Sequence, residues 1–248
     1  MPPGNPTNCS LTCNNCFLVN GIYFQTTVMT ILDQLLLLPL FQGMNTTDIE
    51  TLAGQTKFGF LRQQKGKTII SEGDVCEGFD FLMNGTLLAV TYADDHGYSI
   101  SEQIQAPALL QPECAFGLTQ RYTRTFSTLT PCNMMKLDKS EILRLSEDYV
   151  VFRLNLLNIL TTLSQRQQRS HWHRPPQDLQ QRIVQFVANH CSRPVGHKTL
   201  NIKMTRLAEE LNDSRLDVSR ALNDLQQQGL LTLHRGRIEI PDLRRLLP

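Results

Sequence analysis

The feature that most constrains the fold is a pair of short amphipathic helices separated by a tight polar turn near the C-terminus. Apolar residues recur at helical spacing from Met204 to Leu211, and Asn212-Asp213 then supplies the turn. Ser214 is placed to cap a second helix that runs to about Gln227, with Asp217 as the acidic partner of a capping box. Two helices joined by so short a turn are typical of a helix-turn-helix. The inward positions of the second helix are Val218, Ala221, Leu222 and Leu225.

The outward face of the second helix is suited to a nucleic acid. It lies opposite the apolar stripe and consists of Leu216, Ser219, Arg220, Asn223 and Gln227, with Arg215 on its edge. Apart from the leucine, these side chains can hydrogen-bond to base edges or phosphates. We therefore predict that this helix lies in the major groove of double-stranded DNA.

A basic β-hairpin is predicted directly after this helix. Gly229 ends the helix, and residues 231–233 and 238–240 form the two strands. The turn between them carries Arg235 and Arg237, as the wing of a winged helix-turn-helix would. Any one of these features alone is more often a solvated helix or an ordinary hairpin, and only their order and shared charge favour DNA binding.

The net charge of +1 conceals an uneven distribution of charge along the chain. Residues 1–168 carry 11 Lys and Arg against 15 Asp and Glu, a net charge of −4, whereas residues 169–248 carry 13 against 8, a net charge of +5. A basic C-terminal part indicates a polyanionic partner. Residues 171–176 end in two prolines, which interrupt helices, so we predict a hinge there.

The sequence before the hinge predicts a β domain followed by one long helix. Between Phe58 and Cys132, short alternating runs separated by turn residues predict a sandwich or barrel, preceded by short helices between Met29 and Leu52. Residues 140–168 return to a helical pattern with two apolar faces, so we predict a homodimer through residues 148–170, the alternative being one buried helix in a monomer. The predicted seam is Tyr149, Phe152, Leu156, Ile159 and Leu163, and the second face is Leu154, Leu157 and Leu160.

The chain lacks the sequence signals of a membrane or secreted protein. No apolar run approaches the roughly 20 residues of a membrane helix, and the first 28 residues contain no Lys or Arg for the basic region of a secretory signal. We therefore expect a cytoplasmic protein without a membrane partner, and an odd number of cysteines, seven, argues against a disulfide framework. Residues 1–28 are expected to be a disordered extension.

From about Met29 to the C-terminus the order of elements resembles the Crp/Fnr family of bacterial transcription regulators. The strongest match is residues 203–225, which are similar to the family's helix-turn-helix in length and apolar positions, and residues 65–74 and 81–86 resemble its barrel signatures. The resemblance implies an α+β fold in four parts. They are an N-terminal extension (1–28), a cyclic-nucleotide-binding-like β-barrel or jelly-roll sensor domain (29–147), a dimerisation helix (148–170) and a winged helix-turn-helix domain (171–248).

The resemblance also implies individual DNA contacts. Arg215 and Arg220 match family residues that contact DNA, Arg220 being suited to a guanine edge, and Lys203 matches a phosphate contact. Many members have glutamate where this chain has Leu216, which cannot accept from cytosine N4 but can touch a thymine methyl, so we expect an unusual half-site. The predicted DNA-binding residues are Lys203, Ser214, Arg215, Leu216, Ser219, Arg220, Asn223 and Arg235.

The sequence leaves the sensed signal and the cofactor open. Cyclic-AMP-binding members use a Gly-Glu pair and an Arg-Ser pair, but residues 110–117 contain no Gly-Glu pair, and Pro112 removes a backbone donor. The candidate substitutes in an effector pocket are Glu113, Arg124 and Thr125. Some relatives hold an iron–sulfur cluster on four thiolates. The matching candidate ligands are Cys9, Cys13, Cys16 and Cys132, with Cys114 or Cys76 as alternatives to Cys132, although the spacing differs. No cofactor is the simplest expectation, with the cluster and a cyclic nucleotide as alternatives.

We expect a sequence-specific DNA-binding transcription regulator controlled by a signal sensed in the barrel, with RNA polymerase as a further partner if it activates. A shift of the long helices would change the separation of the two recognition helices. The alternative is a ligand or redox sensor that acts through a protein partner. We expect no enzyme, because the sequence has no phosphate loop, nucleophile elbow, paired metal-binding histidines on a helix or kinase signature.

Overall fold

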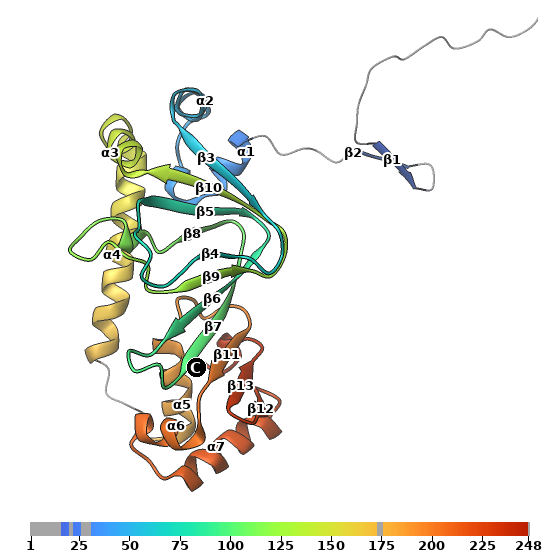
Figure 1. The fold of residues 1–248 in the computed structure, drawn as a ribbon, viewed down its shortest axis with the longest axis vertical. Coiled ribbons are helices and arrows are strands. Elements are labelled where there is room, and N and C mark those ends of the chain that lie inside the picture. Colours follow the sequence, from blue (N-terminus) through green and yellow to red (C-terminus); the bar gives the residue numbers. More distant parts are fainter. Residues whose placement is uncertain (1–15, 20–21, 26–30, 173–175, 248) are drawn as a thin grey trace, which may run out of the picture.

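The computed structural model describes residues 16–19, 22–25, 31–172 and 176–247. A β domain is followed by a long helix that runs along one side of the molecule and by a smaller C-terminal domain (Figure 1). The helices are α1 (Ile31–Leu36), α2 (Thr46–Gln55), α3 (Lys139–Asp148), α4 (Val150–Trp172), α5 (Leu179–Asn189), α6 (Met204–Leu211) and α7 (Arg215–Gln227), with short 3₁₀ turns at Pro39–Phe41, Pro112–Cys114 and Leu243–Arg245. The strands are β1 (Cys16–Val19), β2 (Ile22–Gln25), β3 (Phe58–Gln63), β4 (Thr68–Ile70), β5 (Gly78–Asn84), β6 (Thr86–Tyr92), β7 (Ser99–Gln105), β8 (Ala108–Leu110), β9 (Thr125–Thr128), β10 (Cys132–Asp138), β11 (Lys198–Asn201), β12 (Thr232–His234) and β13 (Arg237–Ile240).

The β domain is a sandwich of two antiparallel sheets, as the sequence predicts. One sheet has the order β3-β10-β5-β8, and the other contains β7-β6-β9-β4. Phe79, Phe81 and Phe126 are fully buried between them, because alternate residues of each strand point inward. The turn from β5 to β6 requires glycine at Gly85, where φ is 95° and a Cβ would lie 2.6 Å from the Cys132 Sγ.

The N-terminal segment contains more structure than the sequence predicts. The expectation for residues 1–28 is a disordered extension, whereas β1 and β2 pair as an antiparallel hairpin within it. The remaining residues of that segment lie outside the described residues.

Helix α4 uses its two apolar faces in the opposite way to the prediction. Phe152, in the predicted coiled-coil seam, is fully buried, and Tyr149, Leu156 and Ile159 pack with it against the core of the β domain. The other face is open to solvent, with exposed fractions of 52% at Leu154 and 51% at Leu157. The predicted seam therefore packs within the chain, where it extends the apolar core of the β domain.

His171 and Trp172, which the sequence places in the predicted hinge, belong instead to α4, which runs to Trp172. Residues 173–175 lie outside the described residues. Within the described part of the chain, no helix is both long and apolar enough to cross a membrane.

The C-terminal domain shares a sheet with the β domain. Strand β11, which the periodicity does not reveal, pairs with β13 on one side and with β7 on the other. Seven strands therefore run continuously in the order β12-β13-β11-β7-β6-β9-β4, and β7 extends out of the sandwich to lie beside β11 (Figure 1). The core of the C-terminal domain accordingly includes Ile100 from β7, which is 2% exposed.

Candidate nucleic-acid interface

The turn between α6 and α7 is built by local chemistry that the sequence predicts. Asn212 ends α6 in the left-handed conformation, with φ of 49°, which asparagine tolerates better than most residues. Ser214 caps α7 because its Oγ accepts from the backbone N–H of Asp217 at 3.1 Å. The Ser214 hydroxyl donates in return to the Asp217 carboxylate at 2.6 Å, so the acidic partner acts on the cap side chain rather than on the cap N–H.

Arg182 on α5 fastens this turn to the rest of the domain. Its guanidinium donates to the Leu211 carbonyl at 3.0 Å and forms an ion pair with Asp213. The backbone N–H of Ser214 and the Arg182 guanidinium together lower the pKa of the Asp213 carboxyl below its ordinary value. At neutral pH the start of α7 is thus held by the Ser214 hydroxyl, the Asp213 carboxylate and the Arg182 guanidinium. Sequence periodicity places Arg182 on α5 but does not reveal this contact.

The outward face of α7 is exposed, and its inward face is buried, as predicted. Val218, Ala221, Leu222 and Leu225 are at most 7% exposed and pack in the C-terminal core. On the other side Leu216 is 60% exposed, and the Arg220 side chain is 68% exposed and lies 3.2 Å from Asp217 in a surface ion pair. Ser219 is half-buried, and the remaining exposed members of the predicted set are Lys203, Ser214, Arg215, Asn223 and Arg235.

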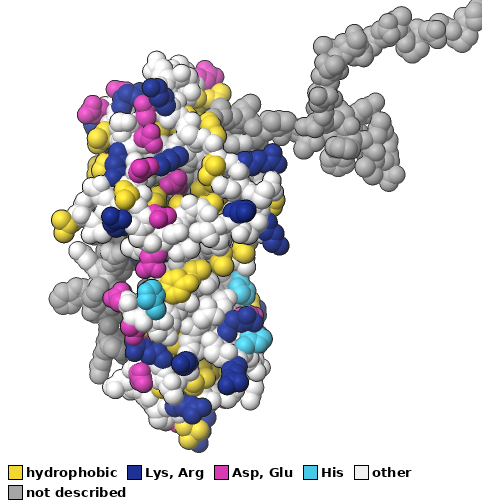
Figure 2. Space-filling view, in the orientation of Figure 1, with side chains coloured by type: hydrophobic (Ala, Val, Ile, Leu, Met, Phe, Trp, Pro, Cys, Tyr) yellow, Lys and Arg dark blue, Asp and Glu magenta, His cyan; other side chains and the backbone are white. Residues whose placement is uncertain are grey.

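The hairpin after α7 has the form of a wing. Strands β12 and β13 pair antiparallel through a turn at Arg235-Gly236, where the glycine has φ of 73°. The Gln226 side chain accepts from the Leu233 N–H at 2.7 Å and so fixes the hairpin to α7. Among the described residues, Arg235 at the tip forms no ion pair, whereas Arg237 pairs with Glu239 at 3.0 Å. Figure 2 shows Lys and Arg side chains gathered over this lower part of the molecule, where the C-terminal domain lies.

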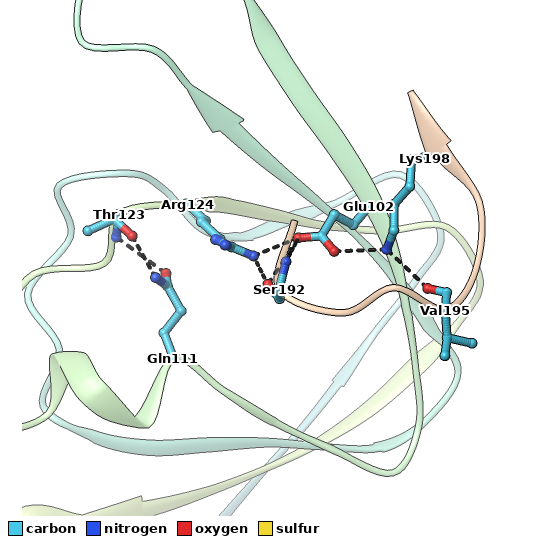
Figure 3. Close-up of polar contacts among 7 residues, drawn as sticks. All are labelled: Glu102, Gln111, Thr123, Arg124, Ser192, Val195 and Lys198. Carbon is cyan, nitrogen blue, oxygen red and sulfur yellow. Dashed lines mark hydrogen bonds and ion pairs between the residues drawn. The ribbon is translucent and has the colours of Figure 1, made fainter. Parts of the chain in front are cut away.

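The predicted effector residues divide between a pocket and its surroundings. A pocket of about 210 Å³ lies between the sandwich, α4 and the loop after α5, and its lining includes Glu113, Arg124 and Arg193. Thr125 is not part of that lining, and its Oγ1 accepts from the Glu72 N–H at 3.1 Å instead. The Gln111 side chain binds Thr123 through two hydrogen bonds and so steadies the segment that carries Arg124 (Figure 3).

The cysteines are not assembled into a metal site in the described part of the chain. Cys132 is 1% exposed and donates to the Thr130 carbonyl at 3.1 Å, and burial raises the pKa of the Cys114 thiol to about 11. The described residues contain no group of three or more potential metal ligands. Cys9 and Cys13 lie outside the described residues, as does the side chain of Cys16, so the iron–sulfur ligand set stays a prediction.

The sandwich, the long helix and the fastened helix-turn-helix with its basic wing define a protein with a DNA-binding domain joined to a β domain. Residues 181–248 match the model of the Crp-like helix-turn-helix domain. The C-terminal part of the chain is therefore a Crp-like helix-turn-helix domain, and it follows the β domain and the long helix α4. The alternative of a sensor that acts only through a protein partner is not favoured, because the matched domain is a DNA-binding one.

Several solved structures are similar to this chain. The catabolite activator protein of Thermus thermophilus is 17% identical with a TM-score of 0.44, the match covering 84% of this chain and 96% of that one. The protein DNR of Pseudomonas aeruginosa is 20% identical with a TM-score of 0.43, over 91% and 98% of the two chains. A protein of Eubacterium rectale described as a Crp/Fnr-family transcriptional regulator is 21% identical with a TM-score of 0.45, over 84% and 95%. No curated protein matches the sequence significantly.

Proposed function

We propose that this protein binds a specific DNA sequence as a homodimer and that occupancy of the pocket beside α4 controls the binding. The observation that carries the proposal is the outward face of α7. Arg215, Leu216 and Arg220 are exposed there on a helix whose first turn is fixed by Arg182 and Ser214. A rigid helix that presents guanidinium groups and an apolar contact is suited to reading base edges in the major groove.

The proposed contacts divide by chemistry into base readers and phosphate contacts. Arg220 and Asn223 lie on the part of α7 that would enter the groove, with Leu216 one turn earlier, and we assign them to bases. Lys203 directly precedes α6 and Arg235 lies at the tip of the wing, so both would face the DNA backbone. Ser214, Arg215 and Ser219 complete the interface at the N-terminal end of α7, where backbone N–H groups also favour phosphate.

The open face of α4 supports the homodimer. Val150, Leu154 and Leu157 are each more than half exposed on one side of a helix of 23 residues. Large apolar side chains in such an arrangement mark an interface more often than a free surface. Two copies paired along α4 would present two recognition helices, as a palindromic site requires.

Control by an effector is supported by the charged lining of the pocket. Glu113, Arg124, Arg166 and Arg193 contribute to it, an excess of positive charge that favours an anion. We propose no resident cofactor in this pocket. An N-terminal iron–sulfur cluster on Cys9, Cys13, Cys16 and Cys132 stays a separate hypothesis that metal analysis of anaerobically purified protein would decide. RNA polymerase is a partner if the bound protein activates transcription, the expected location is the cytoplasm, and no catalytic activity is expected.

The function is tested by selecting binding sites from a random duplex library with the full-length protein and then titrating the selected duplex at several salt concentrations. We expect a palindromic site and an affinity that falls steeply with salt, because phosphate contacts release counterions. The double variant Arg215→Ala with Arg220→Ala should lose the selected site, whereas Arg62→Ala, an exposed arginine on β3, should retain it. Recovery of no enriched sequence, or equal binding by the double variant, would refute the proposal.

A further inference from the structure

A buried carboxylate joins the two domains at the point where β7 and β11 pair. Glu102 on β7 is 2% exposed and stands opposite Lys198 on β11, which is 1% exposed. The Lys198 ammonium donates to Glu102 Oε2 at 2.9 Å and to the Val195 carbonyl at 3.0 Å. Because one partner comes from the sandwich and the other from the C-terminal domain, this ion pair exists only when the domains are in contact.

The second oxygen of the same carboxylate is also fully used. Glu102 Oε1 accepts from Arg124 at 2.8 Å, from the Ser192 N–H at 2.8 Å and from the Ser192 hydroxyl at 3.0 Å, and Arg124 also donates to that hydroxyl (Figure 3). Two cations and a backbone N–H thus surround one carboxylate away from water. A buried carboxylate of this kind is tolerated only while its cationic partners are present. Removal of the carboxylate would likewise leave buried cations without compensation.

Further contacts surround this cluster along the shared strand. Tyr98 hydrogen-bonds through its hydroxyl to the His190 ring at 3.1 Å, and Ile100 is inserted into the C-terminal core. At the tip of the β6–β7 hairpin, Asp95 pairs with Arg206 on α6 at 2.9 Å. The hairpin therefore connects the sandwich to the helix that precedes the recognition helix.

Arg124 has a second role, because it also lines the pocket described above, as does Ser192. The guanidinium can direct its hydrogen bonds to Glu102 or to an anion in the pocket, and an anion would compete for it. We infer that Glu102 is a positioning residue that locks the DNA-binding domain onto the sensor domain, and that Arg124 is the group through which the pocket releases this lock. The inference rests on the proposed function for its link to DNA, but the lock itself does not.

The lock is tested by amide hydrogen exchange on the full-length protein, which needs neither DNA nor effector. In Glu102→Gln we expect exchange at residues 198–202 to accelerate by about tenfold or more, since the lost ion pair is buried. Arg124→Gln should accelerate exchange at the same amides to a smaller extent, because Lys198 remains paired with Glu102. An effect there would cross between domains, since residue 124 belongs to the sensor domain. Glu77→Gln, which removes an exposed ion pair with Lys136, is the matched control and should leave them unchanged.

A second measurement distinguishes positioning from simple loss of stability. For each variant, the affinity for a selected duplex with two half-sites is divided by the affinity for one half-site. If the lock fixes the two recognition helices in register, this ratio should fall about tenfold in Glu102→Gln and less in Arg124→Gln. The reason is that the freed domains must be ordered again when the protein binds both half-sites. Unchanged exchange at residues 198–202, or an unchanged ratio, overturns the lock. Failure of the wild type to bind any duplex would instead refute the proposed function and leave the exchange result standing.

Discussion

Arg182 and Asp213 form an ion pair that joins the first helix of the C-terminal domain to the turn of the helix-turn-helix. Since Arg182 also binds the Leu211 carbonyl, it holds both the end of α6 and the start of α7. The helix α7, which we propose to read DNA, is thereby held in place by a residue of α5.

Arg182→Ala should weaken DNA binding without removing a DNA contact. We expect a decrease in Tm of about 2–4 °C and a several-fold loss of affinity for the selected duplex. Arg182→Lys should restore little, because an ammonium cannot make both bonds in one plane. Differential scanning calorimetry and fluorescence anisotropy measure the two effects, and full affinity in Arg182→Ala would contradict the role assigned to the clamp.

Replacement of Arg220 and replacement of Lys203 should lower the affinity for DNA in ways that depend differently on the DNA sequence. Arg220→Ala should cost roughly 1–3 kcal/mol on the selected duplex and relax specificity at one base pair. Lys203→Ala should weaken all duplexes similarly and reduce the salt slope by about one. Titration of matched and single-substituted duplexes at several salt concentrations separates the two. Equal loss on every duplex for both variants would remove Arg220 from the base readers.

Leu216 should determine the unusual part of the half-site. It is exposed beside Arg220 and offers only apolar contact, so we expect a thymine methyl opposite it. Leu216→Glu should shift the selected base toward cytosine with a discrimination of about 1–3 kcal/mol, whereas Leu216→Ala should only weaken the preference. Repeating the site selection with each variant provides the comparison, and an unaltered site in Leu216→Glu would show that this residue does not read the base.

The open face of α4 should be required for dimerisation. Leu154→Arg combined with Leu157→Arg should raise the dissociation constant of the dimer at least about 100-fold, because each buried leucine contributes about 1.5–3 kcal/mol. Leu143→Arg, which changes an exposed leucine of α3, is the control. Sedimentation velocity at micromolar concentration should give monomer for the double variant only. A wild-type monomer would contradict the prediction.

Acid should weaken the contact between the domains. Burial by itself would raise the pKa of the Glu102 carboxyl, but Arg124, Lys198 and the Ser192 N–H together lower it below its ordinary value of 4.5. Since the folded-state pKa is lowered, the stabilisation is present above the unfolded-state pKa and is lost as pH falls through the folded value. The nearby Cys191 stays neutral throughout, because burial raises the pKa of its thiol to about 12.

The measurement is the difference in Tm between the wild type and Glu102→Gln as a function of pH. It should be constant near neutral pH and should shrink progressively below about pH 4.5. Taking the difference cancels the carboxylates with lowered pKa that both proteins share, such as Glu77 and Asp242. A difference that does not depend on pH would mean that the charge of Glu102 contributes nothing to the contact.

The sequence by itself determined the elements whose signals are local. The spacing of Val218, Ala221, Leu222 and Leu225 fixed the buried face of α7, and Ser214 fixed its first residue, because amphipathic period and cap chemistry depend on neighbours within one or two turns. The turns between the strands of the sandwich are determined in the same way. The exposed set of residues that we propose to face DNA follows from this geometry.

Tertiary structure decided everything that depends on residues far apart in the chain. Which face of α4 is covered was predicted wrongly, because two apolar faces are equivalent in periodicity and only the shape of the sandwich selects Phe152. Residues 198–201 carry too short a pattern to reveal a strand, and β11 exists because β7 and β13 supply its hydrogen bonds. The pair of Glu102 and Lys198 spans 96 positions, and no sequence period relates charges that meet only when two domains share a sheet.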